Sequence, residues 1–222
     1  MKYVISKSFQ SMVERTPRVL EVAESFGLGL QDKEFTIYDN LEIDVSRGDV
    51  VYITGQSGSG KSLLLRELAE KLSIHSKDEP SPVVDVDSMM VSDKPLIDQV
   101  GETMTDAIRI LSLAGINDAY LLIRKPSELS DGQKYRLALA KMIESGAKVW
   151  VADEFGAKLD RVTAKVVAFN MQKIARKMGA TLIVATTHND LEKELGPDLK
   201  VEKSYMDRVE ITKQSTERFN NV

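Results

Sequence analysis

The stretch VVYITGQSGSGKSLLLRELAEKL, residues 50–72, decides the fold because its residue pattern changes across a glycine-rich segment. The first five residues are a short apolar run, which is typical of a strand buried on both faces of a parallel sheet. After the glycines, leucines recur at helical spacing. We therefore expect a buried strand over 50–54, then a loop, then a helix.

The loop reads GQSGSGKS and matches the pattern G-x-x-x-x-G-K-[ST] without a gap. Its glycines let backbone N–H groups turn inward around phosphate oxygens, and the following helix N-terminus adds partial positive charge. We expect Lys61 to reach the β- and γ-phosphates of a nucleotide and the Ser62 hydroxyl to hold Mg²⁺. The predicted phosphate-binding residues are Gly55, Gln56, Ser57, Gly58, Ser59, Gly60, Lys61 and Ser62, with position 63, Leu63, closing the segment. A glycine turn that merely precedes Lys-Ser is the alternative, and the strand–loop–helix context speaks against it.

Two carboxylates form the second candidate element of the site. Asp153 and Glu154 follow the apolar run VWVA in the stretch VWVADEF (149–155), and in a parallel sheet ligands bind beyond the carboxyl ends of the strands. Asp153 could then hold Mg²⁺ through water, and Glu154 could act as general base on the attacking water. His188 follows a third apolar run, 181–186, at the same edge. It could contact the γ-phosphate, although a lone histidine is more often structural.

Composition excludes several classes of protein. The 222 residues carry a net charge of −4 and contain no cysteine, so disulfides and cysteine metal sites are absent. No run is long enough to span a bilayer and the N-terminus does not read as a signal peptide, so we expect a cytoplasmic protein. The acidic balance opposes non-specific nucleic-acid binding, while Arg124, Lys125 and the basic stretch 161–177 permit a local patch.

The remaining pattern predicts an α/β fold with a mainly parallel sheet flanked by helices. We expect strands at 18–24, 34–45, 83–86, 147–153 and 181–186, helices at 102–114, 117–123, 132–145 and 160–179, and a ribbon at 198–213. We expect the chain to divide into a mainly antiparallel β subdomain over 1–48, a core over 49–98 and 132–212, a short helical subdomain over 99–131, and a polar tail over 213–222.

The pentapeptide LSDGQ, residues 129–133, adds a signal with no obvious chemistry of its own. Together with GQSGSGKS, VWVADE (149–154), AKLD (157–160) and TTH (186–188), it resembles the ATPase domain of the ABC superfamily, in that family's order. Among its members, the compact layout looks similar to small stand-alone ABC-type ATPases, some of them fused to a predicted acetyltransferase domain. The resemblance covers about residues 20–212.

The resemblance implies an ATP hydrolase that works as a head-to-tail dimer with composite sites. Ser130 and the backbone N–H of Gly132 would meet the γ-phosphate held by the other chain, and Ser130 with Gln133 reads as a helix capping box. Gln99 would be the lid-coupling glutamine. Phe26 or Tyr38 would stack on adenine. Asp131 replaces the usual glycine, and we expect its side chain to point away and help cap the helix.

The interval from Gln99 to Leu129 is short for a transporter ATPase, which favours a non-transport process. We therefore predict an ATP–Mg²⁺-dependent homodimer that powers such a process, with nucleic acid or another protein as a candidate partner and a membrane subunit not expected. The alternatives are the ATP-hydrolysing subunit of an ABC membrane transporter, and an ATP-gated interaction module with slow hydrolysis.

Overall fold

The structure is a computed structural model that describes residues 1–74, 82–204 and 208–213. The elements in chain order are β1 Lys2–Ser11, α1 Pro17–Phe26, β2 Lys33–Asp44, β3 Val50–Gly55, α2 Lys61–Ile74, β4 Val83–Asp85, η1 Val86–Ser88, η2 Leu96–Asp98, α3 Met104–Leu113, α4 Ala119–Leu122, η3 Pro126–Glu128, α5 Asp131–Glu144, β5 Val149–Ala152, α6 Arg161–Met178, β6 Thr181–Thr186, α7 Glu192–Leu195, β7 Leu199–Lys203 and β8 Val209–Lys213.

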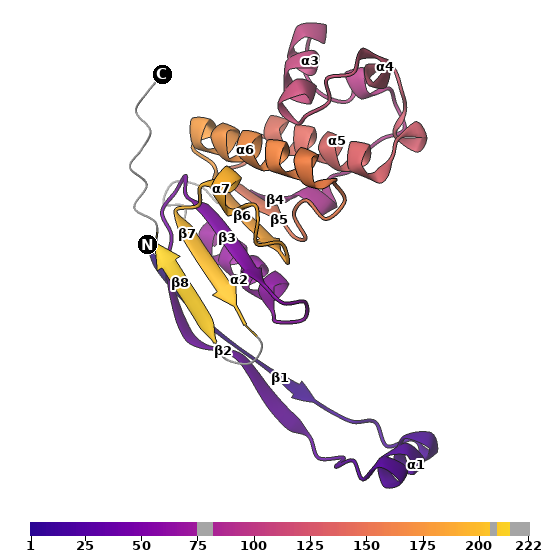
Figure 1. The fold of residues 1–222 in the computed structure, drawn as a ribbon, viewed down its shortest axis with the longest axis vertical. Coiled ribbons are helices and arrows are strands. Elements are labelled where there is room, and N and C mark those ends of the chain that lie inside the picture. The colour runs from indigo at the N-terminus through magenta and orange to yellow at the C-terminus, as the bar shows by residue number, and fades with distance from the viewer. Residues whose placement is uncertain (75–81, 205–207, 214–222) are drawn as a thin grey trace.

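The central sheet has the strand order β4-β5-β6-β3-β7-β8 (Figure 1). All neighbours pair in parallel except β7 and β8, which pair antiparallel. The parallel strands therefore share one carboxyl edge, and the loops after β3, β5 and β6 meet there. This edge carries the candidate site, and the predicted P-loop α/β architecture is confirmed.

Two apolar layers hold the sheet, and side-chain alternation along β3 separates them. Val50 and Tyr52 pack into a core shared with α5 and α6, whereas Val51 and Ile53 pack against α2 and the base of the N-terminal strands. All four are fully buried. Because both faces of β3 are covered, the loop that follows it starts from a fixed point.

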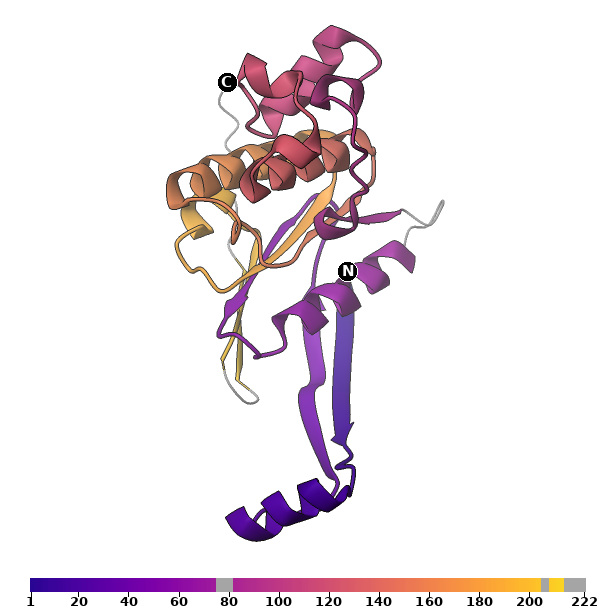
Figure 2. The same cartoon turned by 90° about the vertical axis from the view of Figure 1, so that its right-hand side faces the viewer.

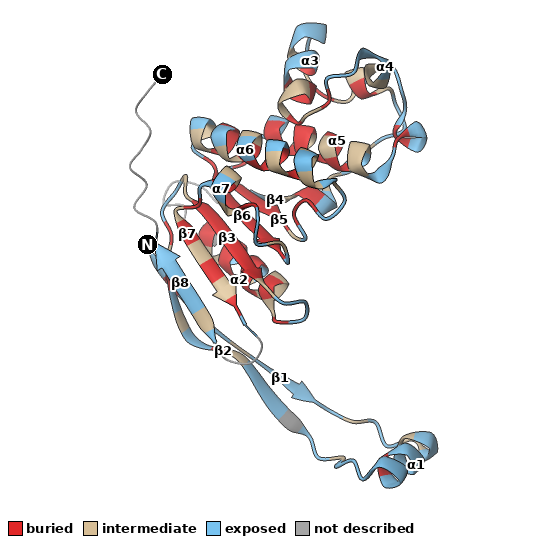
Figure 3. Ribbon diagram, in the orientation of Figure 1, coloured by how far each residue is buried: buried red, intermediate tan, exposed pale blue. Residues whose placement is uncertain are grey.

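The N-terminal elements form a separate two-stranded antiparallel sheet, β1 with β2, that runs beyond the core as an arm (Figures 1 and 2). We call residues 2–44 the arm and residues 12–32, which include α1, the arm tip. The base is buried through Tyr3, Ile5 and Ile43, while the outer part is exposed (Figure 3). The contrast is expected, because an isolated pair of strands has no second layer to cover it.

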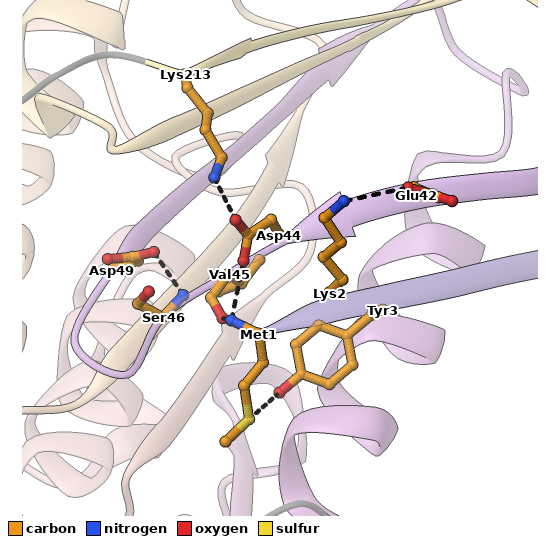
Figure 4. Close-up of polar contacts among 9 residues, drawn as sticks. All are labelled: Met1, Lys2, Tyr3, Glu42, Asp44, Val45, Ser46, Asp49 and Lys213. Atoms are coloured by element: carbon orange, nitrogen blue, oxygen red, sulfur yellow. Dashed lines mark hydrogen bonds and ion pairs between the residues drawn. The ribbon is translucent and has the colours of Figure 1, made fainter.

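Polar ties fix the base of the arm to the core (Figure 4). The Asp44 carboxylate accepts hydrogen bonds from the Lys213 ammonium at 2.6 Å and from the N-terminal ammonium of Met1 at 2.9 Å. These bonds, the one from Lys213 first, lower the pKa of Asp44 to about 2. Because the pKa of Asp44 is depressed in the folded protein, these hydrogen bonds stabilise the attachment of the arm at pH values above the ordinary carboxyl pKa. That stabilisation is lost as the pH falls through about 2.

Some predicted elements need correction. Residues 18–24 are wrong as a strand: they lie in α1, whose Thr16 side chain accepts a hydrogen bond from the Val19 N–H and whose end is Gly27 in the left-handed region. The alternation there was that of an amphipathic helix too short to show its full period. The ribbon at 198–213 exists as β7 and β8, but β7 also joins the main sheet beside β3. Most of the tail, residues 214–222, lies outside the described residues.

Candidate functional site

A cavity of about 400 Å³ opens at the carboxyl edge of the sheet, over the loop between β3 and α2. It gathers residues from three strand ends and from the arm. Its lining is Phe9, Ile37, Ser57, Gly58, Gly60, Lys61, Ser62, Leu63, Arg66, Asp153, Glu154, Thr186 and Thr187. The predicted phosphate residues and the two predicted carboxylates therefore lie around one space.

The phosphate loop, residues 55–62, is held by close contacts with the backbone of β7 and with side chains of β2. Gly55 has φ +141°, and a Cβ there would lie 1.9 Å from the carbonyl oxygen of Lys203 in β7. Gly60 has φ +98°, and a Cβ there would lie 2.8 Å from Cγ2 of Ile37. The hydroxyl of Tyr38 donates to the carbonyl oxygen of Gly60 at 3.0 Å. The loop is thus clamped between β7 and β2.

Lys61 is the first residue of α2 and is largely buried, at 8% exposed. Its Nζ donates to the carbonyl oxygen of Gln56 at 2.6 Å, which closes the loop on itself. Burial lowers the pKa of Lys61, and the negative charges of Asp153 and Glu154 act in the opposite direction. A buried ammonium in the cavity lining can bind a phosphate, whereas the two carboxylates in the same lining would need a cation between them and that phosphate.

Asp153 and Glu154 follow the end of β5. Asp153 Oδ1 accepts a hydrogen bond from the backbone N–H of Glu154 at 3.0 Å. Glu154 has φ +47°, a left-handed conformation that costs a non-glycine residue about 1–3 kcal/mol. The next residue, Phe155, is buried and donates its N–H to the Ala185 carbonyl in β6. The turn therefore presents Glu154 to the cavity at a conformational cost that its neighbours offset.

His188 lies beside the cavity rather than in its lining. Its backbone N–H donates to Oγ1 of Thr186 at 3.2 Å, and its backbone carbonyl oxygen accepts from the hydroxyl of Tyr52. Asn189, the next residue, accepts from the hydroxyl of Thr54 through its Oδ1. The loop after β6 is thus anchored to β3, with Thr186 and Thr187 in the cavity lining and His188 next to them in the chain.

The signature loop, residues 129–133, lies apart from this cavity. Ser130 is the N-cap of α5: its hydroxyl accepts from the N–H of Gln133 at 3.3 Å, and the Gln133 side chain accepts from the N–H of Ser130 at 2.9 Å. The predicted capping box is present. Asp131 and Lys134 line a smaller cavity, of about 190 Å³, together with Tyr135 and Lys158. The two halves expected of a composite site are not joined within one chain.

The loop after Glu154, residues 157–160, connects the two regions. A Cβ on Gly132 would lie 3.0 Å from the carbonyl oxygen of Lys158, so this loop packs on the signature loop. Arg161, which follows it, donates through Nε to the Asp190 carboxylate at 3.1 Å, and Asp190 is two residues from His188. The signature loop and the His188 loop of one chain are therefore linked through residues 157–161.

Gln99 has a local role in this structure. Its side chain accepts from the N–H of Ser92 at 3.2 Å and donates to the carbonyl oxygen of Lys94 at 2.7 Å. It follows η2, whereas the residues that leave β4 at the nucleotide edge are those of η1. The structure does not bring Gln99 to the cavity, because an irregular segment separates it from the strand end.

Neither Phe26 nor Tyr38, the two residues expected to stack on adenine, lines the cavity. Tyr38 is 2% exposed, its ring lies under the Lys203 ammonium, and its hydroxyl supports Gly60, so it is a core residue. Phe26 is on α1 at the far end of the arm (Figure 1). Phe9 of β1 lines the cavity and is half exposed. Spacing from Lys61 along the sequence did not find it, because β1 folds back beside the loop only through pairing with β2.

The fold and the site define the class as a P-loop nucleotide-binding α/β domain. Residues 38–157 match the family described as ABC transporter. The chain belongs to this family of ATP-binding domains, and the predicted ABC-type ATP hydrolase is confirmed at that level. Its family supports ATP as the nucleotide.

Curated relatives are named as import proteins. The chain is 27% identical over 188 residues to the methionine import ATP-binding protein MetN 1 of Oceanobacillus iheyensis, covering 71% of this chain and 55% of that protein. It is 33% identical over 174 residues to the aliphatic sulfonates import ATP-binding protein SsuB 2 of Rhodococcus jostii, covering 71% and 68%. The chain thus spans little more than half of the length of the MetN relatives.

A solved structure has the same fold. The dimeric post-hydrolysis ATP-binding cassette MJ0796 bound to ADP and Pi superposes with a TM-score of 0.65 at 16% identity, covering 95% of this chain and 98% of that one. A putative metal-chelate type ABC transporter in an inward-facing conformation gives 0.58 at 20% identity, covering 82% and 77%.

The expectation about partners is wrong. We predicted that a membrane subunit is not a partner, and the import proteins among the relatives overturn this. The argument from the short 99–131 segment fails because its length limits the area of a docking surface and not the kind of partner. The comparisons also give no support to a non-transport or nucleic-acid role. Within the described residues, no helix is long and apolar enough to cross a membrane.

Proposed function

We propose that this chain is the ATP-hydrolysing subunit of an ABC membrane transporter and acts at the cytoplasmic face of the membrane. The observation that carries the proposal is the single cavity that joins the phosphate loop to Asp153 and Glu154 in a chain whose curated relatives are import ATP-binding proteins. The relatives are named for the import of different substrates, methionine and aliphatic sulfonates.

The phosphate loop would bind the nucleotide through backbone N–H groups, the α2 N-terminus and Lys61. The hydroxyl of Ser59 is buried and has no hydrogen-bond partner among the described residues, which leaves a donor for a phosphate oxygen. Phe9 stands at the cavity wall formed by the arm, and we propose that it, rather than Phe26 or Tyr38, stacks on adenine.

The residues fit Mg²⁺ bound jointly with the nucleotide. Ser62 and Asp153 both line the cavity and offer oxygen ligands. The described residues contain no group of three or more metal-ligating side chains, so the phosphates must complete the coordination. Mg²⁺ is usually held in this way, by one or two carboxylates together with substrate phosphates. The ion would neutralise phosphate charge, and Glu154 would accept the proton of the attacking water.

We infer further that two ATPase domains pair head to tail, because the signature loop has no ligand in its own chain. Ser130 and Gly132 of one copy would then meet the γ-phosphate held by the other. The proposed division of the chain follows from these roles: residues 49–98 and 132–212 bind nucleotide, residues 1–48 cover adenine, and residues 99–131 face the membrane subunit. Met104 and Ile108 of α3, 70% and 39% exposed, are candidate contacts for it.

The test is Glu154→Gln with ATP–Mg²⁺, measured by light scattering and by phosphate release. Removal of the general base should lower turnover by about 10²–10⁴-fold while ATP binding persists, and the protein should accumulate as a pair. Lys61→Ala, which should not bind ATP, is the matched control and should stay monomeric. A Glu154→Gln protein that is saturated with ATP and remains monomeric at all concentrations would refute the pairing.

A further inference from the structure

The arm tip carries an apolar surface that the chain itself does not cover. Met12, Val22, Phe26 and Leu28 are 80%, 49%, 76% and 57% exposed. Beside them lies an open groove of about 360 Å³ with an almost wholly apolar lining that includes Val19, Val22 and Leu30. A patch of this kind on a projecting element marks an interaction site.

The position of the arm indicates which surface meets this patch. Phe9 and Ile37 of the arm line the nucleotide cavity, and beyond them the arm continues past the nucleotide edge of the sheet (Figures 1 and 2). A second copy that closes over the phosphate loop must therefore lie against the overhanging part of the arm. This step rests on the head-to-tail pairing of the proposed function.

Head-to-tail pairing also determines which segment of the second copy would contact the arm tip. Its signature loop would face this chain's phosphate loop, and the segment directly before that loop is α4 with η3. Tyr120 of α4 and Ile123 after it are 75% and 66% exposed. In a two-fold pair each arm meets the same segment of the other copy, so one contact is made twice.

The two surfaces are complementary in chemistry. On α1, the exposed Glu21 and Glu24 lie in the same turns as Val22 and Phe26. On the other segment, the exposed Arg124 and Lys125 directly follow Ile123, and Arg124 also pairs with Glu128 at 2.9 Å within its own chain. An apolar centre flanked by acids would thus meet an apolar centre flanked by bases.

We propose that the arm tip of one copy docks on residues 119–125 of the second copy, with Tyr120 or Ile123 entering the groove. A membrane surface is the less favoured occupant. The tip has two bases, Arg15 and Arg18, and four acids, Glu14, Glu21, Glu24 and Asp32, which gives 2 − 4 = −2. Anionic lipid headgroups attract basic segments and would repel this one.

Because the chain has no cysteine, single cysteines can report the contact directly. Phe26→Cys and Ile123→Cys, each made in the Glu154→Gln protein, are mixed and oxidised with ATP–Mg²⁺ or with ADP. The expected result is a mixed disulfide dimer that forms with ATP and not with ADP. Phe26→Cys mixed with Val162→Cys, an α6 residue 74% exposed, should give none. Tip-to-tip disulfides of Phe26→Cys alone would overturn the proposal.

A charge placed in the contact gives a second readout. Phe26→Asp in the Glu154→Gln protein should raise the dissociation constant of the ATP-bound pair by about tenfold, as loss of an interface aromatic does. Met90→Asp, at a side chain 89% exposed in the segment between η1 and η2, should leave it unchanged. If Glu154→Gln pairs normally, Phe26→Asp leaves that pairing unchanged and the disulfide between Phe26→Cys and Ile123→Cys does not form, the arm inference fails alone. If Glu154→Gln never pairs, the proposed function fails first.

Discussion

The phosphate loop and the signature loop are both short glycine-containing turns ahead of a helix, and they are supported in opposite ways. The phosphate loop is clamped by β7 and Tyr38, and it faces a cavity that four other segments of the chain help to line. The side-chain hydrogen bonds of Ser130 and Gln133 in the signature loop stay within the start of α5, and Ser130 is exposed. The difference indicates that one loop is completed by its own chain and the other is not.

The largest expected effect tests the clamp. Gly55→Ala places a Cβ 1.9 Å from the Lys203 carbonyl oxygen, which is backbone and cannot move aside. We expect a loss of stability of about 4 kcal/mol or more, or failure to fold, by urea denaturation. Gly58→Ala is the matched control, because no atom lies within 4 Å and only its φ of +73° is strained. It should cost about 1–2 kcal/mol. Equal losses would contradict the clamp.

The second prediction concerns the exposed loop. Ser130→Arg should lower turnover by at least about 100-fold, the usual cost of losing a donor to transition-state charge, and should leave ADP affinity unchanged. The measurements are phosphate release and equilibrium binding. Ser130→Asn, which retains helix capping, separates the cap from the contact with phosphate. A parallel fall in ADP affinity would mean that this loop belongs to the chain's own site.

The third prediction separates Phe9 from Phe26, two of the exposed phenylalanines of the arm. Phe9→Ala should weaken ADP binding by about fivefold, which corresponds to about 1 kcal/mol of lost stacking. Phe26→Ala should not change it, because Phe26 lies at the arm tip. ADP is the proper ligand, since it lacks the γ-phosphate needed for pairing. An effect of Phe26→Ala as large as that of Phe9→Ala would contradict the assignment.

The fourth prediction tests the link between the loops. Arg161→Ala removes the contact with Asp190 and should slow turnover about two- to fivefold with little change in KM. The pair is about half exposed, so the effect is small. Asp190→Ala should act alike, and the double variant should add little. Fully additive effects would show that the pair does not connect the His188 loop to residues 157–161.

Sequence predicted the parts of the site that are contiguous and failed for those that depend on tertiary pairing. The phosphate loop, the two carboxylates and the Ser130 capping box are local patterns with a local physical cause. Phe9 reaches the cavity only because β1 pairs with β2 around α1, and no spacing along the chain encodes that. Gln99 was placed by its distance from Lys61, and the irregular segment after β4 made that distance misleading.

The smallest expected effect concerns Asp131, where the family usually has glycine. Its side chain is 87% exposed and lies 3.9 Å from the Lys134 ammonium in the first turn of α5. An acid at that position stabilises a helix by about 0.3–1 kcal/mol, whereas its charge is screened by solvent from a phosphate bound across an interface. Asp131→Gly should therefore lower the melting temperature slightly and change turnover by less than about twofold. A rise in turnover of tenfold or more at low salt, absent at high salt, would instead show that the carboxylate repels the incoming phosphate.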